Sequence, residues 1–398
     1  MSRSATPLRL VVLLGLLNAA APLSTTMYVP AMPGMATDLS AGAAALQATI
    51  SGLTLGLAAG HLVVGPLSDR FGRKRPLLVA LVSYVLACVG CATAPSVEVL
   101  IAARVLQGVA GAGGIVVGRA IVRDLHEGAT ALRLFALMVA VTSVTPVVSP
   151  LLGGQVLLLG SWRDIFLVQG LVGASLAAAT ALLVPETLPP ARRRPETPWA
   201  VTRAAAALLR GRVVLGFSLT CGLVYGGMLA AMGGATFALQ RVYGVSEELA
   251  SVLLAGAAAT MLLASRINTR LAPLHGPERM LRLGVAATVA GGLLTLATVL
   301  AGLGVVVFVP AVALSFSAHA LSLPNATALV LAEKPDALGS ASAALGVTQY
   351  ALAAAAAPLG GLVGGGTAVP MAVEITALGV AAYAASAMAL RARRPAAV

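Results

Sequence analysis

The sequence predicts an all-α membrane protein in which twelve transmembrane helices form two six-helix bundles. Three observations predict this class: an apolar composition, apolar runs of spanning length, and basic residues confined to alternate loops. Of the 398 residues, 59% are hydrophobic and only 10% are charged, and the mean hydropathy is +0.95. Soluble domains carry about 25% charged residues, so this chain requires lipid as its solvent.

Apolar runs follow one another along the whole chain. A bilayer core of about 30 Å requires about 20 apolar residues at a rise of 1.5 Å each. The first run is too long for the apolar region of a signal peptide and lacks a small-residue cleavage site, so we expect it to remain as a span. The predicted spans are residues 8–29, 44–67, 77–95, 98–119, 132–158, 164–184, 212–238, 249–268, 282–302, 304–323, 339–365 and 369–390.

The basic residues predict the orientation of these spans, because Lys and Arg near span ends stay on the cytoplasmic side. With the N-terminus inside, the inner segments hold 23 of the 26 basic residues. Arg163 and Arg241 fall outside, and Arg104 falls within a span. One missed span would destroy this asymmetry. We therefore expect a multi-pass protein of the bacterial inner membrane with both termini cytoplasmic and no binding of nucleic acid.

A polar stretch rich in proline and arginine divides the spans six and six. It predicts an N-terminal six-helix bundle at residues 1–184, a cytoplasmic linker at 185–211 and a C-terminal six-helix bundle at 212–398. Transporters built from repeated halves hold their substrate between the halves, near the middle of the membrane. We expect the same here, with a monomer as the working unit.

The sequence offers no enzyme-like site. The three cysteines lie inside apolar runs without zinc-ligand spacing. No paired carboxylates, metal-spaced histidines or Ser/His/Asp set share a membrane face. We therefore expect no metal, no cofactor and no enzymatic activity.

The loop after the second span reads Gly65-Pro-Leu-Ser-Asp69-Arg70-Phe-Gly72-Arg73-Lys-Arg-Pro. Gly65 is expected to let the helix end approach a neighbour, Gly72 to allow a tight turn, and the basic residues to hold the loop inside. This loop resembles the signature G-x-L-[AS]-D-R-x-G-R-[KR] of major facilitator transporters. The resemblance implies the major facilitator fold and a gating role for these five residues.

In that family the aspartate, here Asp69, meets the N-terminal end of the eleventh helix and latches the outward-open form. Exposed N–H groups at a helix N-terminus favour an anion. The corresponding end here is expected near Gly339, Ser340 and Ser342. A hairpin that only keeps its charges inside is the alternative.

The fourth predicted span carries Arg104 and Gln107 on one helical face beside a glycine seam. An arginine at the bilayer centre costs at least about 2.5 to 3.5 kcal/mol, so we expect Arg104 to face a cavity or a polar partner. The run resembles the family's second motif, R-x-x-Q-G, which implies a role for Arg104 in proton transfer. Outward snorkelling of the side chain is the alternative.

The fifth predicted span carries a continuous stripe of small and polar residues. Within it, Ser149-Pro150-Leu-Leu-Gly153-Gly154 resembles the antiporter motif G-P-x-x-G-G of drug/proton exporters, with Ser149 in place of the first glycine. We expect these four residues to take part in conformational gating. Ordinary small-residue packing between helices is the alternative.

Further segments narrow the resemblance. They are Ser24-Thr-Thr26-Met-Tyr28-Val-Pro30, Ser161-Trp-Arg163-Asp, Pro185-Glu-Thr, Pro324-Asn-Ala-Thr and Gly339-Ser-Ala-Ser. Together they are similar to the Bcr/CflA group of drug-resistance transporters. The resemblance implies export of small, largely apolar compounds such as bicyclomycin or chloramphenicol by alternating access, in exchange for protons.

One departure concerns the coupling residue. The group usually has an aspartate where this chain has Thr26, and threonine cannot carry a proton. His61 and His319 lie within spans, and imidazole titrates near neutral pH. Either could carry the coupled proton, or each could serve as a hydrogen-bonding group between helices.

Other polar or soft side chains within the spans are candidates for the substrate site, which should be mainly apolar with few polar anchors. They are Asn18, Thr25, Thr26, Tyr28, Gln107, Thr142, Thr145, Tyr225, Met228 and Gln349. Two alternatives stay open: an importer of another small-molecule class on the same scaffold, and an uncoupled facilitator, which Thr26 favours.

Overall fold

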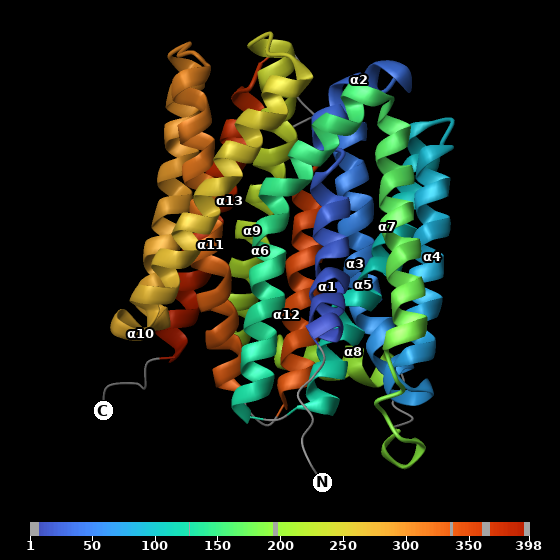
Figure 1. The fold of residues 1–398 in the computed structure, drawn as a ribbon. Helices are drawn as coiled ribbons and strands as arrows, with labels where there is room; N and C mark the ends of the chain where they lie inside the picture. The colour runs from blue at the N-terminus through green and yellow to red at the C-terminus, as the bar shows by residue number, and fades with distance from the viewer. Residues whose placement is uncertain (1–7, 127, 194–197, 335–336, 360–366, 394–398) are drawn as a thin grey trace, which may run out of the picture.

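The computed structural model describes residues 8–126, 128–193, 198–334, 337–359 and 367–393, and within them every regular element is helical (Figure 1). Three of the basic residues counted above, Arg3, Arg194 and Arg394, lie outside the described residues. The same holds for residues 360–365 of the predicted eleventh span.

The first part of the chain forms six long helices and one short cap. The cap follows the first helix because Pro30 and Pro33 each begin a new short helix. The elements are α1 (Leu8–Thr26), the 3₁₀ helix η1 (Val29–Ala31), α2 (Met32–Asp38), α3 (Ala43–Phe71), α4 (Lys74–Ala92), α5 (Val97–Leu125), α6 (Gly128–Leu159) and α7 (Trp162–Leu183).

The rest of the chain begins with two short helices in the polar stretch, neither of which was predicted. The elements are η2 (Pro190–Arg192), α8 (Pro198–Leu208), α9 (Arg212–Phe237), the π-helix η3 (Ala238–Val242), α10 (Glu247–Leu300), α11 (Val305–Glu333), α12 (Leu338–Ala356) and α13 (Val369–Arg393).

Ten helices of the described chain are long and apolar enough to cross a membrane. One of them, α10, has 54 residues and would be about 81 Å long if straight. Its backbone breaks at Gly276, where φ is 78°, so α10 makes two passes. With α12, which is 19 residues long, the number of passes is twelve, and the prediction of twelve helices is confirmed.

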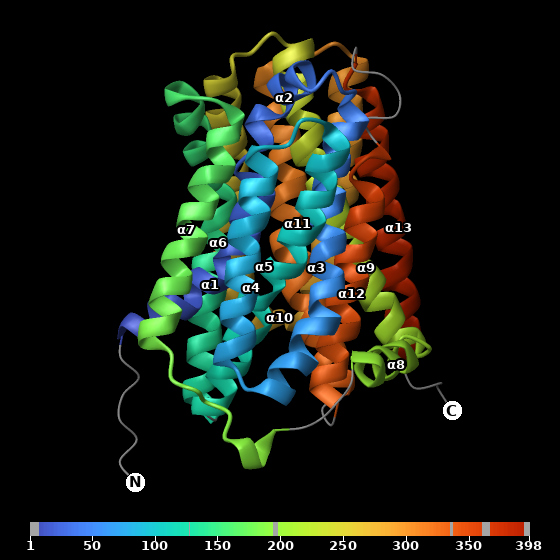
Figure 2. The same cartoon turned by 90° about the vertical axis from the view of Figure 1, so that its right-hand side faces the viewer.

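Helix contacts are most extensive within each part of the chain. In the first part α5 packs on α3 and α4, α4 on α7, and α1 on α6; in the second, α9 packs on α12 and α13, and α10 on α11. The packing of α3 on α5 depends on glycine, because a Cβ on Gly108 would overlap the carbonyl oxygen of Leu53. The most extensive contacts between the two parts are those of α3 with α12 and of α6 with α10, and Figure 2 shows α3 beside α12.

The helix bundle has two distinct ends. The start of α1, the end of α13 and α8 lie at one end, which we call the terminal face (Figures 1 and 2). The opposite end carries α2 and is called the α2 face. These two faces frame the candidate sites described next.

Candidate functional site

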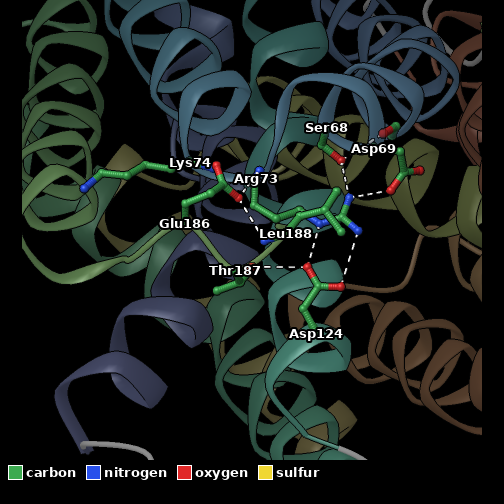
Figure 3. A network of polar contacts seen from close by, with 9 residues as sticks. Ser68, Asp69, Arg73, Lys74, Asp124, Glu186, Thr187 and Leu188 are labelled. Carbon is green, nitrogen blue, oxygen red and sulfur yellow. Dashed lines mark hydrogen bonds and ion pairs between the residues drawn. The ribbon is translucent and has the colours of Figure 1, made fainter. Parts of the chain in front are cut away.

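Three polar assemblies contain most of the residues singled out by the sequence. The first lies at the terminal face, between the ends of α3 and α5 and the segment after α7 (Figure 3). Arg73 is 6% exposed and is its centre. Its guanidinium donates to Ser68 Oγ at 2.8 Å, to Asp69 Oδ1 at 2.5 Å and to Asp124 Oδ2 at 2.7 Å. Burial lowers the pKa of Arg73, but the bonds to Asp124 and Asp69 outweigh it and raise the pKa above its ordinary value.

Glu186 closes the same network from the segment after α7. Its carboxylate accepts the backbone N–H groups of Arg73 at 2.8 Å, Lys74 at 3.3 Å and Leu188 at 3.0 Å. It thereby caps the start of α4, where free N–H groups favour an anion. Partial burial works to raise the pKa of Glu186, but these backbone bonds outweigh it and lower the pKa. Thr187 donates to Asp124 Oδ2 at 3.1 Å.

Two glycines of this loop differ in their roles. Gly72 has φ 91°, and a Cβ there would overlap the Glu186 carboxylate. The predicted tight turn is therefore present, and the close approach of Glu186 is a second reason for glycine. At Gly65 a Cβ would meet Val116 Cγ1 at 3.6 Å, an ordinary van der Waals distance. The predicted close approach at Gly65 is wrong.

Asp69 was expected to meet the N-terminal end of the eleventh membrane helix, which is α12, but it has a different partner. Its carboxylate binds Arg73, and within the described residues no hydrogen bond or ion pair joins it to the start of α12. A Cβ on Gly339 would have no neighbour within 4 Å. The guanidinium carbon of Arg70 lies 5.1 Å from the centre of the Phe71 ring.

The second assembly surrounds Arg104, which is 0% exposed inside the first six helices. Its Cζ lies 4.3 Å from the ring centre of Tyr28 and 5.7 Å from that of Phe166. Its Nη1 donates to Gln107 Oε1 at 2.6 Å, which confirms that the two share a face. Cation–π contacts and the amide, rather than a carboxylate, hold the charge among the described residues.

Gln107 extends the Arg104 assembly to two further helices. Its amide nitrogen donates to Gln169 Oε1 on α7 at 3.0 Å and to Cys88 Sγ on α4 at 3.1 Å. Tyr28 is bound in turn, since its hydroxyl lies 2.7 Å from Thr49 Oγ1 on α3. Arg104, Gln107 and Tyr28 thus form one network inside the first part of the chain.

The small-residue stripe of α6 faces α1. Asn18 Nδ2 donates to Thr142 Oγ1 at 2.6 Å. A Cβ on Gly153 would overlap the carbonyl oxygen of Met27, and one on Gly154 would lie 2.8 Å from Ser251 Oγ of α10. The two glycines therefore permit close contacts to different parts of the chain.

Other candidates on α1 and α6 bond to their own helices. The hydroxyls of Thr25 and Thr26 donate to the carbonyls of Ala21 and Pro22, at 2.9 and 3.1 Å. Thr145 bonds the carbonyl of Val141 at 3.4 Å in the same way. Ser149 is 0% exposed and lies in α6 between Pro146 and Pro150.

The third assembly is a row of four rings from four helices. His61 of α3 lies 5.2 Å from Tyr350 of α12, Tyr350 lies 5.7 Å from Tyr225 of α9, and Tyr225 lies 5.5 Å from His319 of α11, measured between ring centres. We call these four residues the ring row. It joins the first part of the chain to the second, and it contains three candidates from the sequence together with Tyr350, which sequence reasoning missed.

The remaining candidates do not meet in one place. Met228 is 6% exposed within the apolar core, and Gln349 is 8% exposed and precedes Tyr350 in α12. Two hollows, of 460 Å³ beside His275 and 280 Å³ beside Val85, contain none of the candidates. Sequence reasoning gave no role to Asp124, Glu186 and Tyr350, because their partners lie far away in the sequence. Glu186 belongs to the segment Pro185-Glu-Thr, which had been noted only for its similarity to a family.

The chain crosses the membrane twelve times, has polar and aromatic groups between its two parts, and has a charge network at one face. These features define a membrane transporter rather than an enzyme. The sequence model of the family described as "Major Facilitator Superfamily" matches residues 14–358, and the chain belongs to this family.

Relatives of known sequence match nearly the full length. An "Uncharacterized MFS-type transporter YdgK" of Bacillus subtilis is 35% identical, over 92% of this chain and 91% of the relative. A "Bicyclomycin resistance protein homolog" of Haemophilus influenzae is 28% identical, over 91% of each chain. Among solved structures, a D-xylose-proton symporter superposes with a TM-score of 0.75 at 14% identity, over 97% of both chains, a likeness of fold alone.

Proposed function

We propose that this protein exports small, largely apolar drugs or metabolites, of the bicyclomycin or chloramphenicol kind, by alternating access in exchange for protons. The ring row carries the proposal, because it sets two titratable side chains and two phenols between the parts of the chain that must move. The resemblance to a bicyclomycin resistance protein homolog over nine-tenths of the chain supports a drug as substrate.

The moving units in this proposal are residues 1–184 and 212–398, joined by the linker 185–211. On the α2 face, Gln240 donates to the carbonyl of Pro30 at 2.8 Å and Arg241 to that of Pro33 at 3.0 Å. Toward the terminal face, the interface contains α3 and α12. Alternating access requires the contacts of the α2 face to break when that face opens.

The proposed proton carriers are His61 and His319. Nδ1 of His61 lies 2.8 Å from the carbonyl oxygen of Leu57, which leaves Nε2 toward α12, where Gly346 is adjacent. His319 is 6% exposed and stacks on Tyr225. Arg104 is proposed to influence this proton transfer through its network with Gln107 and Tyr28.

An uncoupled facilitator is the second candidate function. The observation in its favour is Thr26, whose hydroxyl bonds the carbonyl of Pro22 at the position where the related group has an acid. A transporter with no proton carrier at all would only equilibrate its substrate. Transport that is insensitive to a protonophore would favour this candidate.

The proposed setting is the bacterial inner membrane, with both termini in the cytoplasm and a monomer as the working unit. The terminal face is then the inner face. This orientation places the network of Arg73 at the cytoplasmic end of the helices.

The test is expression in an efflux-deficient host, followed by growth on chloramphenicol-like, bicyclic and cationic compounds. We expect protection against at least one compound, which a protonophore abolishes. Asp69→Asn and Arg104→Gln should remove this protection at unchanged membrane levels. Full protection in both variants would contradict the gating mechanism, and no protection by the unmodified protein against any compound would contradict drug export.

A further inference from the structure

A hollow of 460 Å³ lies where α10 reverses direction, next to the end of α13. The two passes of α10 meet there at Gly276, and α10 packs on α13. Figure 1 shows this turn at the terminal face, at the outer edge of the bundle. We call it the basic hollow, and the titratable residues of its lining are His275, Glu278, Arg279, Arg282 and Arg393.

Positive charge exceeds negative charge in the basic hollow. Its three arginines and one glutamate give a net charge of +2 with the histidine neutral. Glu278 accepts from Arg393 Nη1 at 2.8 Å, and its other oxygen lies 3.9 Å from Arg282 Nη2. Glu333 of α11 lies 3.9 Å from Arg393 Nε and offsets one further charge. Within the described residues Arg279 makes no hydrogen bond or ion pair, so its charge has no compensating acid there.

The basic hollow differs from the network of Arg73 at the same face. Arg73 is 6% exposed and binds two carboxylates, so its donors are occupied. Arg279 is exposed, and the side chain of Arg282 is 48% exposed. The two lie three residues apart on α10, a spacing that puts them on one helical face. Two guanidinium forks are therefore open to an incoming anion, and their geometry matches phosphate oxygens.

Apolar side chains on either side of these arginines favour a lipid over a soluble anion. Leu274 is 77% exposed and Leu283 is 58% exposed. An exposed leucine on a membrane pass contacts the acyl chains of the bilayer. A phospholipid carries its phosphate directly above such chains, and basic pockets at the ends of membrane helices bind anionic headgroups. The edge position shown in Figure 1 places the basic hollow beside the surrounding lipid.

We propose that the basic hollow binds the headgroup of an anionic phospholipid, with its phosphate between Arg279 and Arg282 and its acyl chains along Leu283. Arg393, held by Glu278, fixes the end of α13 as one wall of the site. The site contains no member of the ring row. It does not rest on the proposed export function, because lipid binding is measured without transport.

The test is lipid binding to the purified protein, measured by native mass spectrometry and by thermal unfolding in detergent. Dioleoylphosphatidylglycerol and dioleoylphosphatidylcholine share their chains and a phosphate, but the second also carries a cation, which arginines repel. We expect the unmodified protein to bind phosphatidylglycerol more tightly than phosphatidylcholine. Arg279→Gln/Arg282→Gln should lose at least about tenfold in affinity for phosphatidylglycerol, as expected when hydrogen bonds to a charged group are removed.

The matched control is Arg203→Gln/Arg210→Gln, which removes two exposed arginines at α8 and should keep full affinity for phosphatidylglycerol. Arg279→Lys/Arg282→Lys should keep part of that affinity, because it retains the charge but not the fork. Arg279→Gln alone separates binding from folding. It should lower the affinity for phosphatidylglycerol while leaving the unfolding temperature without lipid unchanged.

Three results would overturn the site. They are equal affinity of the unmodified protein for the two lipids, equal affinity of the hollow variant and its control for phosphatidylglycerol, and stabilisation by inorganic phosphate that matches stabilisation by phosphatidylglycerol. The last result would indicate a soluble anion instead. A protein that binds phosphatidylglycerol through these arginines but protects no cell would contradict the export proposal alone.

Discussion

The imidazole of His61 on α3 and the imidazole of His319 on α11 lie at the two ends of one row of rings, joined by Tyr350 and Tyr225. Neighbouring ring centres in this row are 5.2 to 5.7 Å apart. The row crosses from one part of the chain to the other. A change in the contact of α3 with α12 therefore disturbs the surroundings of His61 directly, and those of His319 only through Tyr350 and Tyr225.

The first prediction concerns proton coupling through this row. His61→Asn and His319→Asn, made separately, keep a hydrogen-bonding side chain but cannot titrate near neutral pH. We expect at least one of them to abolish substrate-induced proton movement in everted vesicles while substrate still binds. His275→Asn is the control, because His275 is exposed and lies outside the ring row.

Proton movement that persists in both single variants and in the double variant would reject these histidines as carriers. Proton movement that is absent even in the unmodified protein, with substrate transport intact, would instead support the uncoupled facilitator. The double variant is informative in one further case, since two carriers that substitute for each other would fail only together.

Much of the fold could be predicted from local signals. Span length and the distribution of arginines gave twelve passes because each helix satisfies its own backbone and must match the bilayer. The ends of the helices were less predictable, since α5 continues to Leu125, six residues beyond the predicted end of the fourth span. The short helix α8 was missed for a related reason: it lies in the stretch classified as linker.

The sites were less predictable than the helices. The shared face of Arg104 and Gln107 follows from helical spacing alone and was found. The link from Glu186 to Arg73 joins residues 113 positions apart, and no periodicity encodes such a contact. Gly65 was expected to allow a close approach because glycine lacks a side chain, whereas the close approach in that loop occurs at Gly72.

The second prediction concerns the contact of α6 with α1. Gly153→Ala forces a methyl group against the carbonyl of Met27, and overpacking of this kind costs about 1 to 3 kcal/mol. We expect a lower unfolding temperature in detergent and reduced transport. Gly256→Ala on α10 is the control, because a Cβ there meets nothing within 4 Å. Equal stability of the two variants would show that α1 and α6 do not rely on glycine at this point.

The third prediction concerns pH and the cap of α4. The pKa of Glu186 is lowered below its ordinary value of 4.5, so the folded state favours the carboxylate. The resulting stabilisation is fully present above the unfolded pKa and is lost as pH falls through the lower folded pKa. Glu186→Gln should therefore be less stable than the unmodified protein at pH 7, and the difference should shrink below about pH 4.5.

Thermal unfolding in detergent from pH 7 to pH 3 measures this difference directly. Asp69 and Asp124 are unchanged in both proteins, so the comparison isolates the substitution at residue 186. The prediction concerns the difference in unfolding temperature between the unmodified protein and Glu186→Gln, which should become smaller as the pH falls. A gap that stays constant over this range would mean that Glu186 stabilises α4 without its charge.

The fourth prediction concerns the direction in which the chain crosses the membrane. The segment after α7 lies at the terminal face with α8, whereas Arg241 of η3 binds the carbonyl of Pro33 beside α2. Reporter domains fused after Val184 and after Gln240 should therefore report opposite compartments, with the first in the cytoplasm. A reporter at the C-terminus should agree with the one after Val184, because α13 returns to the terminal face. If the reporters after Val184 and Gln240 share a compartment, the two parts of the chain cannot have the proposed arrangement in the membrane, and the ring row would lose the interface on which its role depends.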